Sequence, residues 1–109
     1  MSTPELVNAS TIDELADVIG MERLEKLIDR FIASLAEAFP GEGRAAAEVG
    51  REAHTFVSMA GMLGCDALSE ACRTLEHRVK RGEDIAAPLG EARRARDATH
   101  DALVRRRGG

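Results

Sequence analysis

The residue type with the clearest capacity for chemistry is the histidine at position 54, in the middle of a helix predicted over residues 44–63. A neutral imidazole nitrogen is a competent nucleophile near pH 7. At 100° per residue, His54 lies nearly opposite the apolar face of this helix. Three residues share its outward strip: Val57, Ser58 and Gly61. Two of them are small, so we expect a surface that a large partner can approach. An inert surface histidine is the alternative interpretation of this spacing.

Other candidate groups give weaker signals. His77 and His100 have no second histidine at a metal-ligand spacing such as His-x-x-x-His, so we interpret both as surface residues. Cys65 and Cys72 lie seven residues apart on one predicted helix face and are interpreted as reduced core residues, which suits a reducing cytoplasm. We find no glycine-rich phosphate loop and no catalytic serine or cysteine elbow, and we expect no metal site and no cofactor.

The elements that would position His54 are all helical. Apolar residues recur at steps of three and four, glycines punctuate the pattern, and a Pro-Gly-Glu-Gly turn follows residue 39. A capping box at Thr11 and Glu14 is predicted to begin the first helix, and Pro88 suits the first turn of the last one. The predicted helices span residues 11–18, 21–39, 44–63, 66–81 and 88–106. The predicted fold is all-α, an up-and-down four-helix bundle with a short additional N-terminal helix. It forms one domain over residues 1–109, with a core at about 10–105 and short flexible ends.

Charge and hydropathy narrow the class of protein. The formal net charge is −4, so nucleic acid is not the expected partner. No apolar run approaches membrane-spanning length, and the N-terminus lacks the pattern of a signal peptide. The basic run Arg105-Arg106-Arg107 is interpreted as favourable charge at a helix C-terminus with a solvated tail.

The sequence around His54 resembles a known motif. Residues 52–64, EAHTFVSMAGMLG, have alanine before the histidine, an apolar residue two positions after it, small residues four, six and seven after it, and an apolar residue and glycine nine and ten after it. This is similar to the motif of histidine-containing phosphotransfer (HPt) proteins. Residues 67–76, ALSEACRTLE, resemble the family's next helix, and residues 15–31 resemble its first two helices. The resemblance covers residues 10–105.

The resemblance implies that His54 carries a phosphoryl group between receiver-domain aspartates in a two-component phosphorelay. The chain would then be a phosphocarrier without autokinase activity, acting as a monomer. Its partners would be response-regulator receivers and a sensor or hybrid histidine kinase, and the receiver would supply the metal and most acidic groups. A phosphorylated imidazole is reactive enough to pass the group on. Three residues near His54 are expected to contact the receiver: Val57, Gly61 and Met62.

Two positions depart from the family pattern. Val57 stands where the family usually has lysine, and Ser58 stands where it usually has glycine. The lost lysine would have stabilised the transferring phosphoryl group, whereas serine only narrows the approach. Since residues three apart on a helix are neighbours, we hypothesise that Arg51 supplies the missing charge to His54. An ordinary solvated arginine is the alternative.

Two other functions remain open. A degenerate member of the family would bind a receiver or kinase without efficient phosphotransfer, and the missing lysine favours that reading. A structural module for oligomerisation would require a continuous exposed apolar stripe, and the charged outer faces of the predicted helices argue against it.

Overall fold

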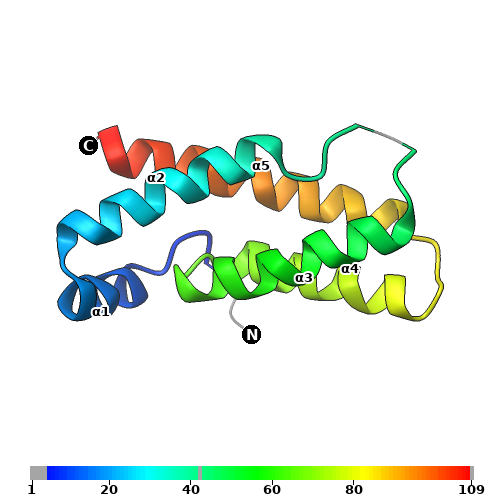
Figure 1. Cartoon of the computed structure of the whole chain (residues 1–109), viewed down its shortest axis with the longest axis horizontal. Coiled ribbons are helices and arrows are strands. Elements are labelled where there is room, and N and C mark those ends of the chain that lie inside the picture. Colours follow the sequence, from blue (N-terminus) through cyan, green and yellow to red (C-terminus); the bar gives the residue numbers. More distant parts are fainter. Residues whose placement is uncertain (1–4, 42, 109) are drawn as a thin grey trace.

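The chain folds into helices arranged in two layers. A computed structural model describes residues 5–41 and 43–108, and these residues form five helices and no strand. The helices are α1 (Ala9–Ile19), α2 (Met21–Glu37), α3 (Ala46–Met62), α4 (Asp66–Lys80) and α5 (Ala86–Gly108). In Figure 1, α2 and α5 form one layer, α3 and α4 form the other, and α1 lies beside the start of α2. The predicted all-α bundle with a short N-terminal helix is confirmed. The predicted flexible ends fall partly on residues 1–4 and 109, which lie outside the described residues.

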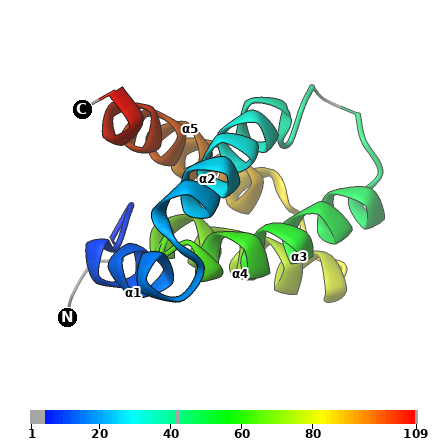
Figure 2. The same cartoon turned by 60° about the vertical axis from the view of Figure 1, so that its left-hand side comes forward.

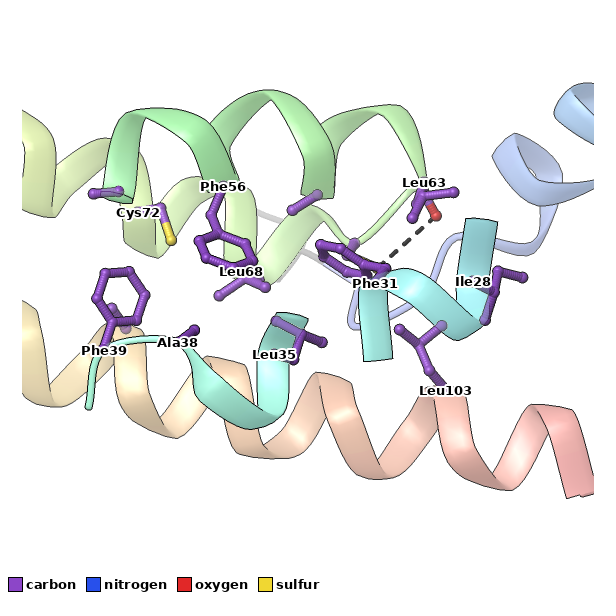
Figure 3. Packing of buried hydrophobic residues seen from close by; sticks show 14 of the residues in the cluster. Ile28, Phe31, Leu35, Ala38, Phe39, Phe56, Leu63, Leu68, Cys72 and Leu103 are labelled. Atoms are coloured by element: carbon purple, nitrogen blue, oxygen red, sulfur yellow. Dashed lines mark hydrogen bonds between the residues drawn. The ribbon is translucent and has the colours of Figure 1, made fainter. Parts of the chain in front are cut away.

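Aromatic rings join the two layers. The ring of Phe56 on α3 lies 6.0 Å from the ring of Phe31 on α2 and 5.9 Å from the ring of Phe39, measured between centroids. Figure 3 shows these rings between the layers, with aliphatic side chains filling the space around them. Tilted ring pairs at this separation add to the stabilisation from burial alone. The apolar face predicted for α3 is buried as expected: Val49, Ala53, Phe56, Ala60 and Leu63. One side of α3 is thereby fixed in the core, and the opposite side faces outward.

The helix boundaries differ from those predicted. The predicted capping box is wrong, because α1 begins at Ala9 and its N-cap is Asn8, whose side-chain oxygen accepts a hydrogen bond from the Thr11 backbone N–H at 3.3 Å. Helix α2 ends two residues early, since the chain turns extended after Glu37 and Phe39 adopts a left-handed φ of 50°. Helix α5 begins at Ala86, before Pro88. Proline is tolerated at this place because the N–H groups of the first helical turn have no partners within the helix. Glu42, in the predicted turn, lies outside the described residues.

The turn between α3 and α4 is packed against the N-terminal segment. Gly64 has a φ of 72°, and its carbonyl accepts a hydrogen bond from the Asn8 N–H at 2.8 Å. A Cβ at this position would lie 2.9 Å from Thr11 Cβ and 3.0 Å from the Asn8 oxygen. On the other side of the turn, the Ala67 N–H donates to the Glu5 carbonyl at 2.9 Å. Glycine is therefore required here both by its backbone conformation and by the close approach of α1.

Arginines of α5 tie it to α2. Arg96 Nη1 donates to the Ala38 carbonyl at 2.8 Å, just after α2 ends. Arg107 donates to both carboxylate oxygens of Asp29, at 2.7 and 3.1 Å, and this hydrogen bonding lowers the pKa of Asp29 from its ordinary value. The prediction of a solvated basic tail is therefore corrected at Arg107. All three arginines belong to the last turn of α5 and are exposed, but the Arg107 guanidinium is bound to Asp29 of α2.

No helix within residues 5–41 and 43–108 has both the length and the apolar character needed to cross a membrane.

Candidate functional site

His54 projects from the outward side of α3, as the sequence predicts. Its side chain is 70% exposed, whereas the preceding residue, Ala53, is fully buried. The imidazole does not stand alone, because its Nδ1 atom lies 2.6 Å from Oε2 of Glu76 on α4. The two residues are 22 positions apart in the chain, and the pairing of α3 with α4 brings them together.

Glu76 is ionised and largely shielded from solvent. Its side chain is 12% exposed. Burial opposes ionisation, but hydrogen bonds from His54 and Lys80 outweigh it and hold the pKa of Glu76 below its ordinary value. A carboxylate can only accept hydrogen bonds, so Nδ1 of His54 carries the proton and donates it to Glu76. The other ring nitrogen, Nε2, then keeps its lone pair on an exposed imidazole.

Cations lie beside this pair. Lys80, one helical turn after Glu76, places Nζ 3.3 Å from the same Oε2 atom that His54 contacts. Lys80 and Arg51 both line a depression of about 510 Å³ next to His54. Four more residues besides Glu76 complete its lining: Ala47, Gly50, Thr55 and Val79. The site thus combines a nucleophilic nitrogen, a carboxylate behind it and positive charge at its edge.

Small residues on α3 allow α4 to approach closely enough for these contacts. Gly50 is buried, and a Cβ there would lie only 2.8 Å from Val79 Cγ1. Nearer the other end of the helix, a Cβ on Gly61 would meet Ser69 Oγ at 3.5 Å, and that hydroxyl donates to the Val57 carbonyl at 2.9 Å. The two contacts set the spacing and register of α3 against α4, and through them the position of Glu76.

The residues predicted to support His54 (Arg51 and Ser58) or to contact the receiver (Val57, Gly61 and Met62) fall into two groups. Arg51 is exposed and lines the depression together with His54, and its carbonyl accepts a hydrogen bond from the Thr55 hydroxyl at 3.2 Å. The other four lie on the C-terminal side of His54, outside the lining of the depression: Val57, Ser58, Gly61 and Met62. Ser58 and Gly61 are exposed, Met62 is 52% exposed, and Val57 is half-buried. Two surfaces therefore flank the imidazole along α3.

Sequence reasoning missed Glu76 and Lys80 as site residues. A signal for Glu76 was present, because it follows Leu75 and lies four positions after Cys72, at the edge of the buried face of α4. A carboxylate at such a position needs a polar partner. The partner is His54, which only the pairing of the helices reveals.

The remaining candidates are placed as follows. His77 is exposed, and His100 is partly exposed with Nδ1 3.6 Å from Asp101. Both cysteines, Cys65 and Cys72, are free and fully buried, and burial raises the pKa of each thiol to about 12. In the part of the chain that the structure describes, no three histidine, cysteine or acidic residues are grouped as metal ligands would be.

A protein-family model matches most of the chain. The family model for the Hpt domain matches residues 20–105, from the start of α2 almost to the end of α5. Comparisons with curated proteins and with solved structures gave no significant match. Hpt domains are phosphocarriers rather than enzymes, act in two-component phosphorelays, and interact with receiver domains and histidine kinases. Since the matched region spans most of the chain and contains His54 with its whole surrounding site, this protein belongs to the Hpt domain family.

Proposed function

We propose that His54 accepts a phosphoryl group from a receiver-domain aspartate and passes it to the aspartate of another receiver. The observation that carries this proposal is the hydrogen bond from His54 Nδ1 to Glu76, 2.6 Å long, on an imidazole that is 70% exposed. It selects one tautomer and orients the ring, which leaves Nε2 as the attacking atom. The match to the Hpt domain supports the same role.

The transfer step needs few groups from this chain. The Nε2 lone pair attacks the phosphorus of the aspartyl phosphate, the N–P bond forms, and the P–O bond to the aspartate breaks and releases its carboxylate. The imidazole gains positive charge during the attack, and the carboxylate of Glu76 stabilises that charge through the Nδ1 proton. In the second transfer a carboxylate oxygen of the next receiver's aspartate attacks the phosphorus and forms an O–P bond, while the N–P bond breaks and its electron pair returns to Nε2. Glu76 is thus a positioning residue: it holds the Nδ1–H group of His54, and with it the imidazole ring, in place through both steps.

The surface along α3 suits a large partner. Ser58 and Gly61 are exposed and small, so they allow a receiver to come close to the imidazole. Met62 is 52% exposed and adds apolar contact, and the half-buried Val57 borders the same area. We propose that one receiver at a time docks on this surface. The carrier is a monomer in the cytoplasm, and a sensor or hybrid histidine kinase is the source of the phosphoryl group in the relay.

The test is phosphotransfer from a panel of phosphorylated receiver domains to the purified protein, with His54→Ala as the control. We expect rapid labelling that is acid-labile, alkali-stable and dependent on His54. Glu76→Ala should slow labelling about tenfold, the effect of losing one charge-assisted hydrogen bond in the transition state. Failure of every receiver to label the wild-type protein would refute the carrier role.

The second candidate function is that of an adaptor, which binds a receiver or kinase without efficient transfer. One observation favours it: Val57, an apolar and half-buried residue, occupies the position where the family motif has lysine. An adaptor would bind a receiver in a solution titration while His54 stayed unlabelled.

A further inference from the structure

We propose that Lys80, on α4, supplies the positive charge for the phosphoryl group that the motif lysine supplies in other family members. This inference rests on His54 being the phosphoacceptor. In the family motif the lysine is on the same helix as the histidine, whereas Lys80 is on the neighbouring helix, α4.

The helix of the histidine has no cation at the motif position. Val57 is half-buried, and its backbone carbonyl accepts a hydrogen bond from Ser69 of α4. This part of α3 is therefore used to pack the two helices together. A phosphoryl group on His54 would find no positive charge from residue 57.

Lys80 is held at the site by a specific contact. Its Nζ atom lies 3.3 Å from Glu76 Oε2, and the same oxygen accepts the proton of His54 Nδ1 at 2.6 Å. One carboxylate oxygen thus joins the imidazole and the ammonium. The Lys80 side chain is 68% exposed, so rotation about its flexible stem can turn the ammonium from Glu76 toward a group on the imidazole.

Charge balance explains why a cation is needed here. A phosphoryl group on Nε2 brings close to two negative charges near neutral pH. While Nδ1 keeps its proton, the phosphorylated ring carries one positive charge, which Glu76 offsets, so the charge of the phosphoryl group itself is left without compensation. Lys80, which lies against Glu76 and lines the depression, supplies that compensation.

Arg51 is the competing source of charge. It lines the same depression from the other helix, three residues before His54. Lys80 is favoured because its ion pair with Glu76 ties it to the imidazole through a shared atom. The two residues are distinguished by replacing each one separately.

The experiment phosphorylates His54 with phosphoramidate, a small-molecule donor, so that no receiver is required. The ³¹P resonance of the product is titrated with pH, and the half-life of the phosphohistidine is measured. A nearby cation lowers the pKa of the phosphoryl group, so Lys80→Ala should raise that pKa by about 0.5 unit or more and shorten the half-life. Lys80→Arg should keep most of the wild-type behaviour, and Arg51→Ala should cause a smaller shift.

Two further variants make the test specific. Lys26→Ala is the matched control, because Lys26 is 71% exposed and pairs with Glu22 at the same i, i+4 spacing on α2. Val57→Lys, combined with Lys80→Ala, restores a cation at the motif position and should return the phosphoryl pKa toward the wild-type value. Rescue of this kind is not expected if Lys80 has only a structural role.

The outcomes separate this inference from the proposed function. An unchanged ³¹P titration in Lys80→Ala, or a larger shift in Arg51→Ala, would overturn the assignment to Lys80. If phosphoramidate labels His54 but no receiver does, the relay proposal fails while the assignment to Lys80 is still decided. If phosphoramidate gives no label at His54, the inference falls together with the phosphoacceptor assignment.

Discussion

Gly50 of α3 packs against Val79 of α4 beside the site, and replacing it with alanine tests whether this contact positions Glu76. The new Cβ would lie 2.8 Å from Val79 Cγ1 and 3.3 Å from Val79 Cβ. Because the side chain of Val79 is branched at that Cβ, rotation about χ1 cannot relieve the whole overlap, and the helices must separate. Overpacking of this kind costs about 1–3 kcal/mol, while alanine in place of glycine in a helix returns about 1 kcal/mol. The net expectation is a loss of about 1 kcal/mol, or about 4–8 °C in Tm for a domain of this size.

The assay is urea unfolding followed by circular dichroism, with Gly90→Ala as the matched control. Gly90 is also within a helix, but a Cβ there meets only the Arg94 guanidinium, with Nη1 at 3.6 Å and Nη2 at 4.0 Å, both ordinary contacts. Gly90→Ala should therefore stabilise the protein by about 0.5–1 kcal/mol, opposite in sign to Gly50→Ala. Adding Val79→Ala to Gly50→Ala should recover part of the loss, because it removes the atoms that clash.

The same variant reports on the site. Separating α4 from α3 lengthens the contact between His54 and Glu76, so labelling of Gly50→Ala by phosphoramidate should be slower than labelling of wild type. If Gly50→Ala is as stable as Gly90→Ala and is labelled at the wild-type rate, the reasoning about this helix contact is refuted.

Three other predictions concern the remainder of the fold. Burial raises the pKa of both cysteine thiols to about 12, so a disulfide reagent at pH 8 should react with neither in the native protein and with both in urea; reaction of a native thiol would contradict this. Gly64 and Gly82 both adopt a left-handed φ, so alanine at either position should cost about 1–2 kcal/mol of backbone strain. Gly64→Ala should lower the free energy of unfolding in urea further than Gly82→Ala, because only at Gly64 would the new Cβ meet atoms within 3.0 Å. Equal losses would show that the packing against α1 is unimportant. The pKa of Asp29 is lowered by its hydrogen bond with Arg107, and such a group stabilises the fold above its unfolded pKa and loses this effect as pH falls. Arg107→Ala should thus be less stable than wild type at pH 7, and the difference should shrink as the pH falls below about 4; a difference that does not shrink would argue against the ion pair.

The helices of this protein are predictable because their signals are local. Apolar residues at three- and four-residue spacing gave five helices in the right order, and Gly64 and Gly82 mark two of the helix ends correctly. The wrongly predicted helix boundaries are those that depend on contacts between residues far apart in the sequence. Asn8 outcompetes Thr11 as the cap of α1 while its own backbone N–H binds the carbonyl of Gly64. Helix α2 stops early because the chain must bring Phe39 into the core against α3.

The features of the site likewise separate into one that a single helix determines and one that depends on the pairing of two helices. The exposure of His54 follows from the arrangement of residues around a single helix, so the sequence predicts it. The contact with Glu76 depends instead on how far α4 is shifted along α3, and no pattern within one helix contains that information. Gly50 against Val79, and the Ser69 hydroxyl on the Val57 carbonyl, determine the shift.

The position lost from the motif is itself part of this helix pairing. At residue 57 the chain has valine instead of lysine, and the backbone of that residue is bound to α4. The same pairing brings Glu76 and Lys80 to the imidazole from the opposite helix. The motif along α3 therefore lacks the positive charge of a lysine at residue 57, whereas the folded site has the ammonium of Lys80 next to Glu76. The Lys80→Ala titration with rescue by Val57→Lys tests whether that cation acts on the phosphoryl group, and labelling of His54 by phosphorylated receivers distinguishes a working carrier from an adaptor.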